Sequence, residues 1–253
     1  MITKENLLKK KVALITLGCD KNRVDAEQML YFLKQFGFEF SSNALEAEIV
    51  IVNTCAFLNA SRKESLETII SIKQNSNKLE KLIVTGCLSQ KNLTELEQNL
   101  TEADLILPLK ENKFIVKHIL NLYNIKENFV PEFCNLNRVI STPKHYAYLK
   151  IADGCDNFCS YCTIPFIRGR YKSVQMDQLV SEAKELVSIG VKEIILVAQD
   201  VTKYGFDLYN DYKLVDLIKN LSEIENLKWI RLLYCYPELI TDELISEIDN
   251  NPK

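Results

Sequence analysis

Three cysteines lie close together at Gly154–Cys162, and this segment constrains the chain more than any other. An apolar run at 146–152 predicts a strand, and Cys155, Cys159 and Cys162 follow it at C-x3-C-x2-C spacing. Thiolates this close in one loop can surround one metal centre. A structural zinc site is closed by four ligands, so three cysteines favour a four-iron cluster with one iron open to a small molecule. A zinc site with a distant fourth ligand and three unrelated buried cysteines are the alternatives.

The first 124 residues alternate short apolar runs with amphipathic stretches. The runs predict buried strands at 12–17, 49–52, 81–84 and 105–107, and the stretches predict helices at 22–36, 60–73, 93–100 and 112–123. Such alternation implies a parallel sheet with right-handed crossovers. Asn22 is expected to cap the first of these helices.

Three further cysteines follow successive strands of this predicted sheet. Cys19, Cys55 and Cys87 each come directly after a strand. Because the carboxyl ends of parallel strands meet at one edge of a sheet, we expect the three thiols to lie together. A second metal centre is the sharper hypothesis. The alternative is that each cysteine is a small buried residue at a tight turn.

The second half of the chain repeats the alternation after a stretch without clear periodicity. Strands are predicted at 146–152, 193–198 and 228–233, and helices at 176–189, at 214–224 and from about Thr241, with Gly190 ending the first of them. Three strand–helix units cannot close a barrel. The predicted division is a polar N-terminal tail at 1–10, a domain at 11–124, a linker at 125–145 and an incomplete barrel at 146–253.

Composition narrows the class of protein. The chain has 253 residues with 34 acidic and 31 basic side chains, a balance that weighs against a dedicated nucleic-acid binder. The sequence contains no run of 18 apolar residues, so no membrane span is predicted. Eight cysteines without a secretory signal favour metal binding or catalysis over disulfides, and a cytoplasmic location.

The chain resembles the methylthiotransferases, a branch of the radical S-adenosylmethionine (SAM) enzymes. The matching segments are 17–22 (Leu-Gly-Cys-Asp-Lys-Asn), 52–55 (Val-Asn-Thr-Cys), 85–87 (Thr-Gly-Cys), 154–162 and 168–170 (Arg-Gly-Arg). The resemblance implies an α/β fold in which an open parallel-sheet domain precedes a partial (βα)6 radical SAM barrel. The second half of that barrel, and the TRAM domain that normally follows it in the family, are absent from these 253 residues.

The resemblance also implies two [4Fe–4S] clusters. An auxiliary cluster would be held by Cys19, Cys55 and Cys87, and a SAM-binding cluster by Cys155, Cys159 and Cys162.

In the family, the residue matching Tyr161 lies near the adenine of SAM, although an aromatic packing on the barrel would explain it equally well. Gln199 and Asp200 end a strand at the catalytic face of a barrel, where they would contact cofactor or cap the next loop. Arg168 and Arg170 would contact SAM or substrate, or form a solvated pair. Cys134 and Cys235 are expected to be structural.

Two subfamilies differ in substrate. Segments 20–25, 198–205 and 231–238 resemble the enzymes that add a methylthio group to the β-carbon of an aspartate in the small-subunit ribosomal protein uS12. The other subfamily modifies a tRNA adenosine, and tRNA stays the alternative substrate. An external electron donor of the flavodoxin or ferredoxin kind is implied. A non-enzymatic iron–sulfur electron-transfer protein, or a zinc-binding regulatory protein, would use the same thiolates without binding SAM.

Overall fold

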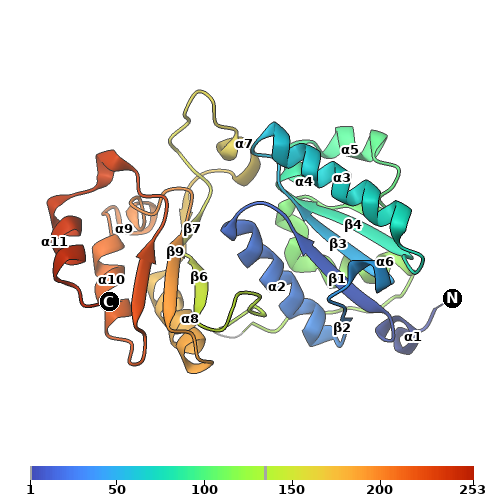
Figure 1. Ribbon diagram of the computed structural model, residues 1–253, viewed down its shortest axis with the longest axis horizontal. Coiled ribbons are helices and arrows are strands. Elements are labelled where there is room, and N and C mark those ends of the chain that lie inside the picture. Colours follow the sequence, from blue (N-terminus) through green and yellow to red (C-terminus); the bar gives the residue numbers. More distant parts are fainter. Residues whose placement is uncertain (1, 134–135) are drawn as a thin grey trace. The chain divides into compact units, whose positions relative to one another are not determined.

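The computed structural model describes residues 2–133 and 136–253, which form two compact units (Figure 1). The N-terminal unit runs to Glu132 and includes 137–139, and the C-terminal unit is built from Ile140–Lys253. Each unit has its own core and is described by itself. None of the helices in the described ranges has the length and apolar character needed to cross a membrane.

The N-terminal unit is organised by a five-stranded parallel sheet in the order β2-β1-β3-β4-β5. Its strands are β1 (Lys11–Thr16), β2 (Glu39–Phe40), β3 (Ile49–Thr54), β4 (Lys81–Gly86) and β5 (Leu105–Ile106). The central strand β3 is buried at every position. A strand buried on both sides is expected of a parallel sheet with helices over both faces.

The described part of this unit contains six α-helices. They are α1 (Lys4–Leu8), α2 (Asp20–Phe36), α3 (Asn59–Asn75), α4 (Cys87–Lys91), α5 (Leu93–Asn99) and α6 (Ile115–Leu122), with 3-10 turns at Ala44–Glu46 and Leu109–Phe114. Ile49 and Ile51 of β3 pack with α2 and α6. Val50 and Val52 are fully buried on the opposite face, where α3 lies across the sheet from α2 (Figure 1).

The structure differs from the sequence-based expectations at both ends of this unit. The predicted polar tail contains α1, whose Leu7 is fully buried in the core, and the Thr3 hydroxyl accepts a hydrogen bond from the Asn6 amide. Near the other end, the helix expected at 112–123 begins with a 3-10 turn and becomes α-helical only at Ile115. The short elements β2 and α4 were too brief for a periodic pattern to predict.

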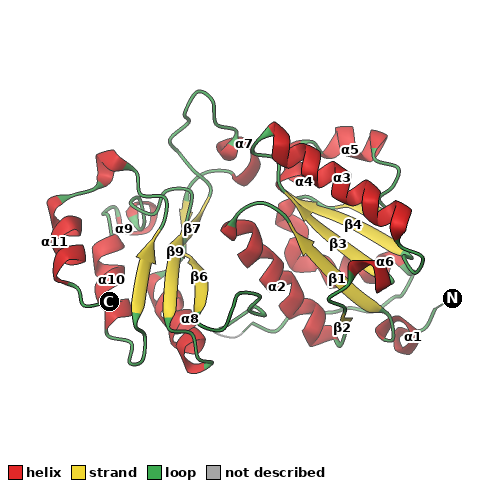
Figure 2. Cartoon of the chain, in the orientation of Figure 1, coloured by secondary structure: helices red, strands yellow, loops and turns green. Residues whose placement is uncertain are grey.

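The C-terminal unit is built on a three-stranded parallel sheet in the order β10-β9-β6. The strands are β6 (Tyr146–Lys150), β9 (Glu193–Val197) and β10 (Trp229–Leu232), and a short antiparallel pair joins β7 (Ala152–Asp153) to β8 (Lys172–Ser173). The helices are α7 (Ile164–Arg168), α8 (Met176–Ser188), α9 (Phe206–Tyr209), α10 (Leu214–Ser222) and α11 (Asp242–Asn250), with a 3-10 turn at Pro237–Leu239. Figure 2 shows strands and helices alternating along this unit.

One face of this second sheet carries the core of the unit. Leu149 of β6 and Leu196 of β9 pack with α8 and α10 in a single apolar cluster. The expected glycine stop after α8 is confirmed, because Gly190 has φ 105° and the Val191 amide donates to the Leu186 carbonyl at 3.1 Å. The α/β fold class is likewise confirmed, since each main sheet is parallel and its strands alternate with helices.

Candidate functional site

The three cysteines of the N-terminal unit lie where parallel strands end, as their spacing predicts. We call Cys19, Cys55 and Cys87 the strand-end cysteines. Cys19 follows β1 at the start of α2, Cys55 follows β3, and Cys87 is the first residue of α4 after β4. Strands β1, β3 and β4 are neighbours in the sheet. Residues far apart in the sequence therefore reach one sheet edge.

Two glycines allow the strand-end loops to come into contact. Gly18 has φ 86°, and a Cβ placed on it would lie 2.7 Å from the Cβ and 2.8 Å from the Sγ of Cys55. Gly86 has φ 103°, and its Cβ would lie 2.4 Å from the Thr54 carbonyl oxygen. Real carbon atoms cannot approach so closely, so each loop depends on the absence of a side chain at these positions.

Asn22 links the ends of all three strands. Its side-chain Nδ2 donates to the Leu17 carbonyl at 3.0 Å and to the Thr54 carbonyl at 2.8 Å. Its Oδ1 lies 3.5 Å from the Sγ of Cys87, within reach of a thiol donor. The predicted helix cap at Asn22 is wrong: α2 begins at Asp20 with Cys19 at the cap position, and Asn22 lies fully buried inside the first turn.

The three cysteines of the C-terminal unit lie in one loop between β7 and α7. We call Cys155, Cys159 and Cys162 the loop cysteines; Cys155 is buried and the other two are half-buried. Gly154 has φ 74°, and a Cβ on it would lie 2.1 Å from the Arg170 carbonyl oxygen. Phe158 adopts φ 46°, a conformation that is uncommon outside glycine. The loop therefore combines a close backbone contact with local strain.

A polar clamp holds this loop from the segment that follows β9. The Nδ2 of Asn157 donates to Oδ2 of Asp200 at 3.2 Å, and the Nζ of Lys203 donates to Oδ1 of Asn157 at 3.0 Å. The backbone amide of Asn157 in turn points at Cys155 Sγ, 3.5 Å away. Asp200 is buried and also accepts a hydrogen bond from the Thr202 amide at 3.1 Å. Asp200 thus caps its own loop and fixes the cysteine loop.

Ion pairs balance the charge around the loop, and Arg168 and Arg170 differ in burial. Burial works to raise the pKa of the Asp153 carboxyl, but Lys150 and Arg168 outweigh it and hold this pKa below its usual range. The expectation of a solvated arginine pair is wrong for Arg168, whose side chain is 1% exposed and donates to Asp153 at 3.0 Å. Arg170 is exposed and pairs with Asp156 at 2.9 Å.

Burial also raises the pKa of the Cys155 thiol. A buried thiol in the free chain therefore keeps its proton more firmly than a solvated one, and binding of a metal has to displace that proton. No disulfide forms among the cysteines that the structure describes. In each triad, three thiols that form no disulfide lie on loops held by hydrogen bonds, and thiolates are the donors that hold an iron–sulfur cluster.

The remaining candidate residues have different surroundings. Tyr161 is 83% exposed, so it does not pack on the barrel as one alternative expected. Gln199 has a buried Oε1 that accepts no hydrogen bond within the described ranges. Cys159 raises the pKa of the Tyr236 phenol, which places the segment after β10 near the loop cysteines. Cys235 packs against the apolar core, as a structural residue would, and Cys134 lies outside the described residues.

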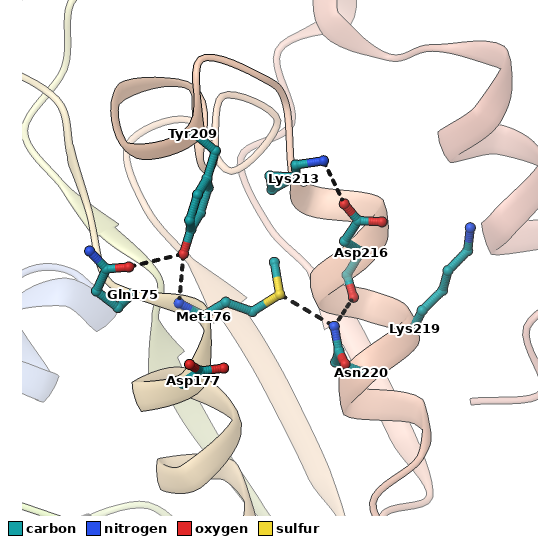
Figure 3. Close-up of a pocket in the computed structure, with 8 residues that line it drawn as sticks. All are labelled: Gln175, Met176, Asp177, Tyr209, Lys213, Asp216, Lys219 and Asn220. Atoms are coloured by element: carbon teal, nitrogen blue, oxygen red, sulfur yellow. Dashed lines mark hydrogen bonds and ion pairs between the residues drawn. The ribbon is translucent and has the colours of Figure 1, made fainter.

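Across residues 2–133 and 136–253, no three acidic, histidine or cysteine side chains are grouped closely enough to hold a single metal ion. A cavity of the C-terminal unit lies elsewhere, between α8, α9 and α10 (Figure 3). It measures about 590 Å³, and none of the triad cysteines lines it. Its Lys213 is paired with Asp216 at 3.0 Å. We assign this cavity no part in the cysteine chemistry.

Sequence reasoning missed the residues that hold the two triads in place. Asn22, Asn157 and Lys203 act through contacts between segments distant in sequence. The available signal was an asparagine inside or just after each cysteine motif. A helix cap or a solvated loop residue explains an asparagine at these positions equally well. Only the fold tells these roles apart.

Family comparisons agree with the two-part architecture. Residues 11–108 match the family described as Uncharacterized protein family UPF0004, and residues 149–252 match the Radical SAM superfamily. The "Ribosomal protein uS12 methylthiotransferase RimO" of Acetivibrio thermocellus is 48% identical over 97% of this chain. The protein of the same name from Clostridium tetani is 45% identical over 98% of the chain. The chain spans 57% of the length of each of these relatives.

Solved structures support the fold. The radical S-adenosylmethionine methyltransferase TsrM from Kitasatospora setae, in a structure with cobalamin and a [4Fe–4S] cluster bound, aligns with a TM-score of 0.60. It is 13% identical, and the match covers 94% of this chain and 58% of that one. Both regions of the chain match their family descriptions, and proteins of one name align along nearly its whole length. The chain therefore combines a UPF0004 region with a Radical SAM region, and nearly all of it is similar to part of the proteins named ribosomal protein uS12 methylthiotransferase RimO.

Proposed function

We propose that this chain is part of a radical SAM methylthiotransferase that adds a methylthio group to the β-carbon of an aspartate in ribosomal protein uS12. The observation that carries the proposal is the pairing of two cysteine triads, one at the ends of three parallel strands and one in a clamped loop. Relatives named for uS12 methylthiotransfer align over almost the whole chain and support the choice of substrate.

The two triads would hold the two [4Fe–4S] clusters of this family. The strand-end cysteines would bind the auxiliary cluster, within the predicted domain at 11–124. The loop cysteines would bind the cluster that takes SAM, within the predicted barrel segment at 146–253. The thiols form no disulfide and their loops are held by hydrogen bonds, which supports this assignment because iron–sulfur clusters are held by cysteine thiolates.

Residues near the loop cysteines are suited to bind and orient SAM. Gln199 offers a buried acceptor without a partner in the described part of the chain, and the exposed Tyr161 ring is available for stacking. When bound, the reduced cluster and SAM supply a radical able to remove hydrogen from an unactivated carbon. The chain's own task is to fix the loop through Asn157 and Asp200 and to present the sulfur-bearing site of the other triad to the substrate.

The proposed partners follow from this chemistry. The substrate is a ribosomal protein, the electron comes from an external donor of the flavodoxin or ferredoxin kind, and the setting is the cytoplasm. A tRNA adenosine is the competing substrate. The 34 acidic and 31 basic residues favour the protein, since gripping tRNA requires many phosphate contacts.

The test offers both substrates to the protein that contains this chain. The anaerobically reconstituted protein is incubated with SAM, reductant, uS12 and tRNA, and both substrates are analysed by mass spectrometry. The methylthio group is expected on an aspartate of uS12. A variant with all three loop cysteines replaced by Ala should give no product, and Cys235→Ala should behave like the parent. Modified adenosine with unmodified uS12 would overturn the substrate assignment.

A further inference from the structure

Asn22 occupies a position from which one side chain reaches the loops of all three strand-end cysteines. It is fully buried. Leu17, whose carbonyl it binds, lies two residues before Cys19, and Thr54, whose carbonyl it also binds, directly precedes Cys55. The third contact is with the Cys87 thiol itself. Because the three strands are adjacent in the sheet, a side chain as short as asparagine spans their ends.

The backbone of Asn22 is held as firmly as its side chain. Its carbonyl accepts a hydrogen bond from Nδ2 of Asn53 at 2.8 Å, and Asn53 is itself fully buried in β3. A Cβ placed on Gly86 would lie 2.6 Å from Oδ1 of Asn53. The side-chain amide of Asn22 is thus oriented by the sheet.

We propose that Asn22 is a positioning residue that holds the strand-end cysteines ready to bind the auxiliary cluster. Its two donations to carbonyl oxygens draw the loop before Cys19 and the residue before Cys55 together, whichever protonation state the thiols have. Its contact with Cys87 belongs to the cluster-free chain, because a thiol that binds iron gives up the proton that it donates here. This inference rests on the proposed function only in naming the group that the thiols bind.

Replacing Asn22 by Asp tests the hydrogen bonds of this side chain separately from its size. The change keeps the size and shape of the side chain but removes both donors, and it places a negative charge beside thiolates. Outer-shell partners of metal ligands typically affect metal affinity by about 10- to 100-fold. We therefore expect the auxiliary cluster of Asn22→Asp, and of Asn22→Ala, to lose iron to a chelator at least about 10-fold faster than the parent.

A matched control exists in the same unit. Asn112 is also buried, and its Oδ1 accepts a hydrogen bond from the Thr85 hydroxyl at 2.5 Å. Asn112→Asp keeps an acceptor oxygen and buries the same charge, so it controls for the cost of a buried carboxylate. It should leave iron retention at the strand-end cysteines close to that of the parent.

The measurement is made in two backgrounds of the full 253-residue chain. With the loop cysteines replaced by Ala, iron content and the electron paramagnetic resonance spectrum report the strand-end site alone. With the strand-end cysteines replaced by Ala, they report the loop site alone. Asn22→Asp should weaken iron retention in the first background and leave the second unchanged. Far-ultraviolet circular dichroism of each variant checks that the unit is folded.

The outcomes separate the inference from the proposed function. If a folded Asn22→Asp chain retains iron at the strand-end site as the parent does, Asn22 has no positioning role. Equal iron loss in both backgrounds, or equal loss with Asn112→Asp, would also overturn it, because the effect would then be general destabilisation. If the parent holds no iron with the loop cysteines removed, the cluster assignment itself is wrong.

Discussion

The two cysteine triads are held in place by different physical means. The strand-end cysteines come from three separate loops, and a parallel sheet brings them to one edge. The loop cysteines lie within eight residues of one another, so proximity is built into the chain and only the conformation of the loop has to be fixed. In the first triad Asn22 joins distant loops; in the second, Asp200 and Lys203 clamp Asn157 within a single loop. A site assembled by the fold should therefore fail when its unit unfolds, whereas a local site should fail when its clamp is released.

The largest expected effect concerns the independence of the two sites. Reconstituted chain should hold about eight irons if each triad binds a four-iron cluster. Replacing all three loop cysteines by Ala should remove about half of the iron, and replacing the strand-end cysteines should remove the other half. Iron analysis with Mössbauer spectroscopy measures both.

The same variants test the division of roles. The chain without strand-end cysteines should still cleave SAM to 5′-deoxyadenosine, since that chemistry is assigned to the loop triad. A chain that binds zinc alone, or one cluster in total, would contradict the two-site comparison. So would complete loss of SAM cleavage while the loop cluster stays intact.

The second prediction concerns one glycine in each triad. Gly18→Ala and Gly154→Ala should both destabilise their unit strongly, because the new Cβ would meet Cys55 or the backbone of Arg170. Gly37 and Gly169 have similar positive φ angles, but a Cβ there meets only ordinary contacts or none. Alanine at these two control positions should cost about 1–2 kcal/mol for the left-handed backbone alone.

Chemical denaturation of the cluster-free variants, followed by circular dichroism, measures these differences. If Gly18→Ala is no more destabilising than Gly37→Ala, the strand-end loops do not touch as the structure shows. The same comparison applies to Gly154→Ala and Gly169→Ala.

A third prediction concerns the clamp. Asp200→Asn replaces one acceptor oxygen by a donor that faces the Nδ2 of Asn157, so the loop triad should release iron to a chelator faster, by up to about 10-fold. Asp207→Asn is the matched control, because Asp207 accepts hydrogen bonds from the amide and hydroxyl of Ser173 and does not contact the cysteine loop.

Iron release is followed by the loss of visible absorbance in the chain that lacks strand-end cysteines. Equal rates for the Asp200 and Asp207 variants would mean that the clamp does not hold the loop. In the chain that lacks the loop cysteines, faster iron release from the strand-end triad on Asp200→Asn would show that the clamp is not specific to the loop site.

The smallest effects are expected from the two arginines that follow the cysteine loop. Arg168→Met leaves the half-buried Asp153 without its buried partner and should destabilise the unit by about 1–3 kcal/mol. Arg170→Met removes an exposed ion pair with Asp156 and should cost less than about 1 kcal/mol. Thermal unfolding of both variants checks the order, and a larger loss for Arg170→Met would reverse our interpretation of the loop.

Local patterns predicted much of the fold. Apolar runs located every long strand, and the position of Cys19, Cys55 and Cys87 directly after strands was enough to predict that they share one sheet edge. Alternating strands and helices also predicted the parallel sheets. These features follow from hydrophobic periodicity and from the geometry of parallel strands, both of which a linear sequence records.

Other features depended on packing between distant segments. Asn22 carries the residue type of a helix cap, yet the structure buries it among three strand ends, because α2 begins two residues earlier at Asp20. Leu7 belongs to a short polar stretch, and its burial is decided by the core that it meets. The strands, the parallel topology and the candidate ligand set could be predicted from the residues alone. Which polar side chains hold those cysteines depends on the folded arrangement, because a hydrogen bond between residues 32 or 43 positions apart leaves no periodic trace in the chain.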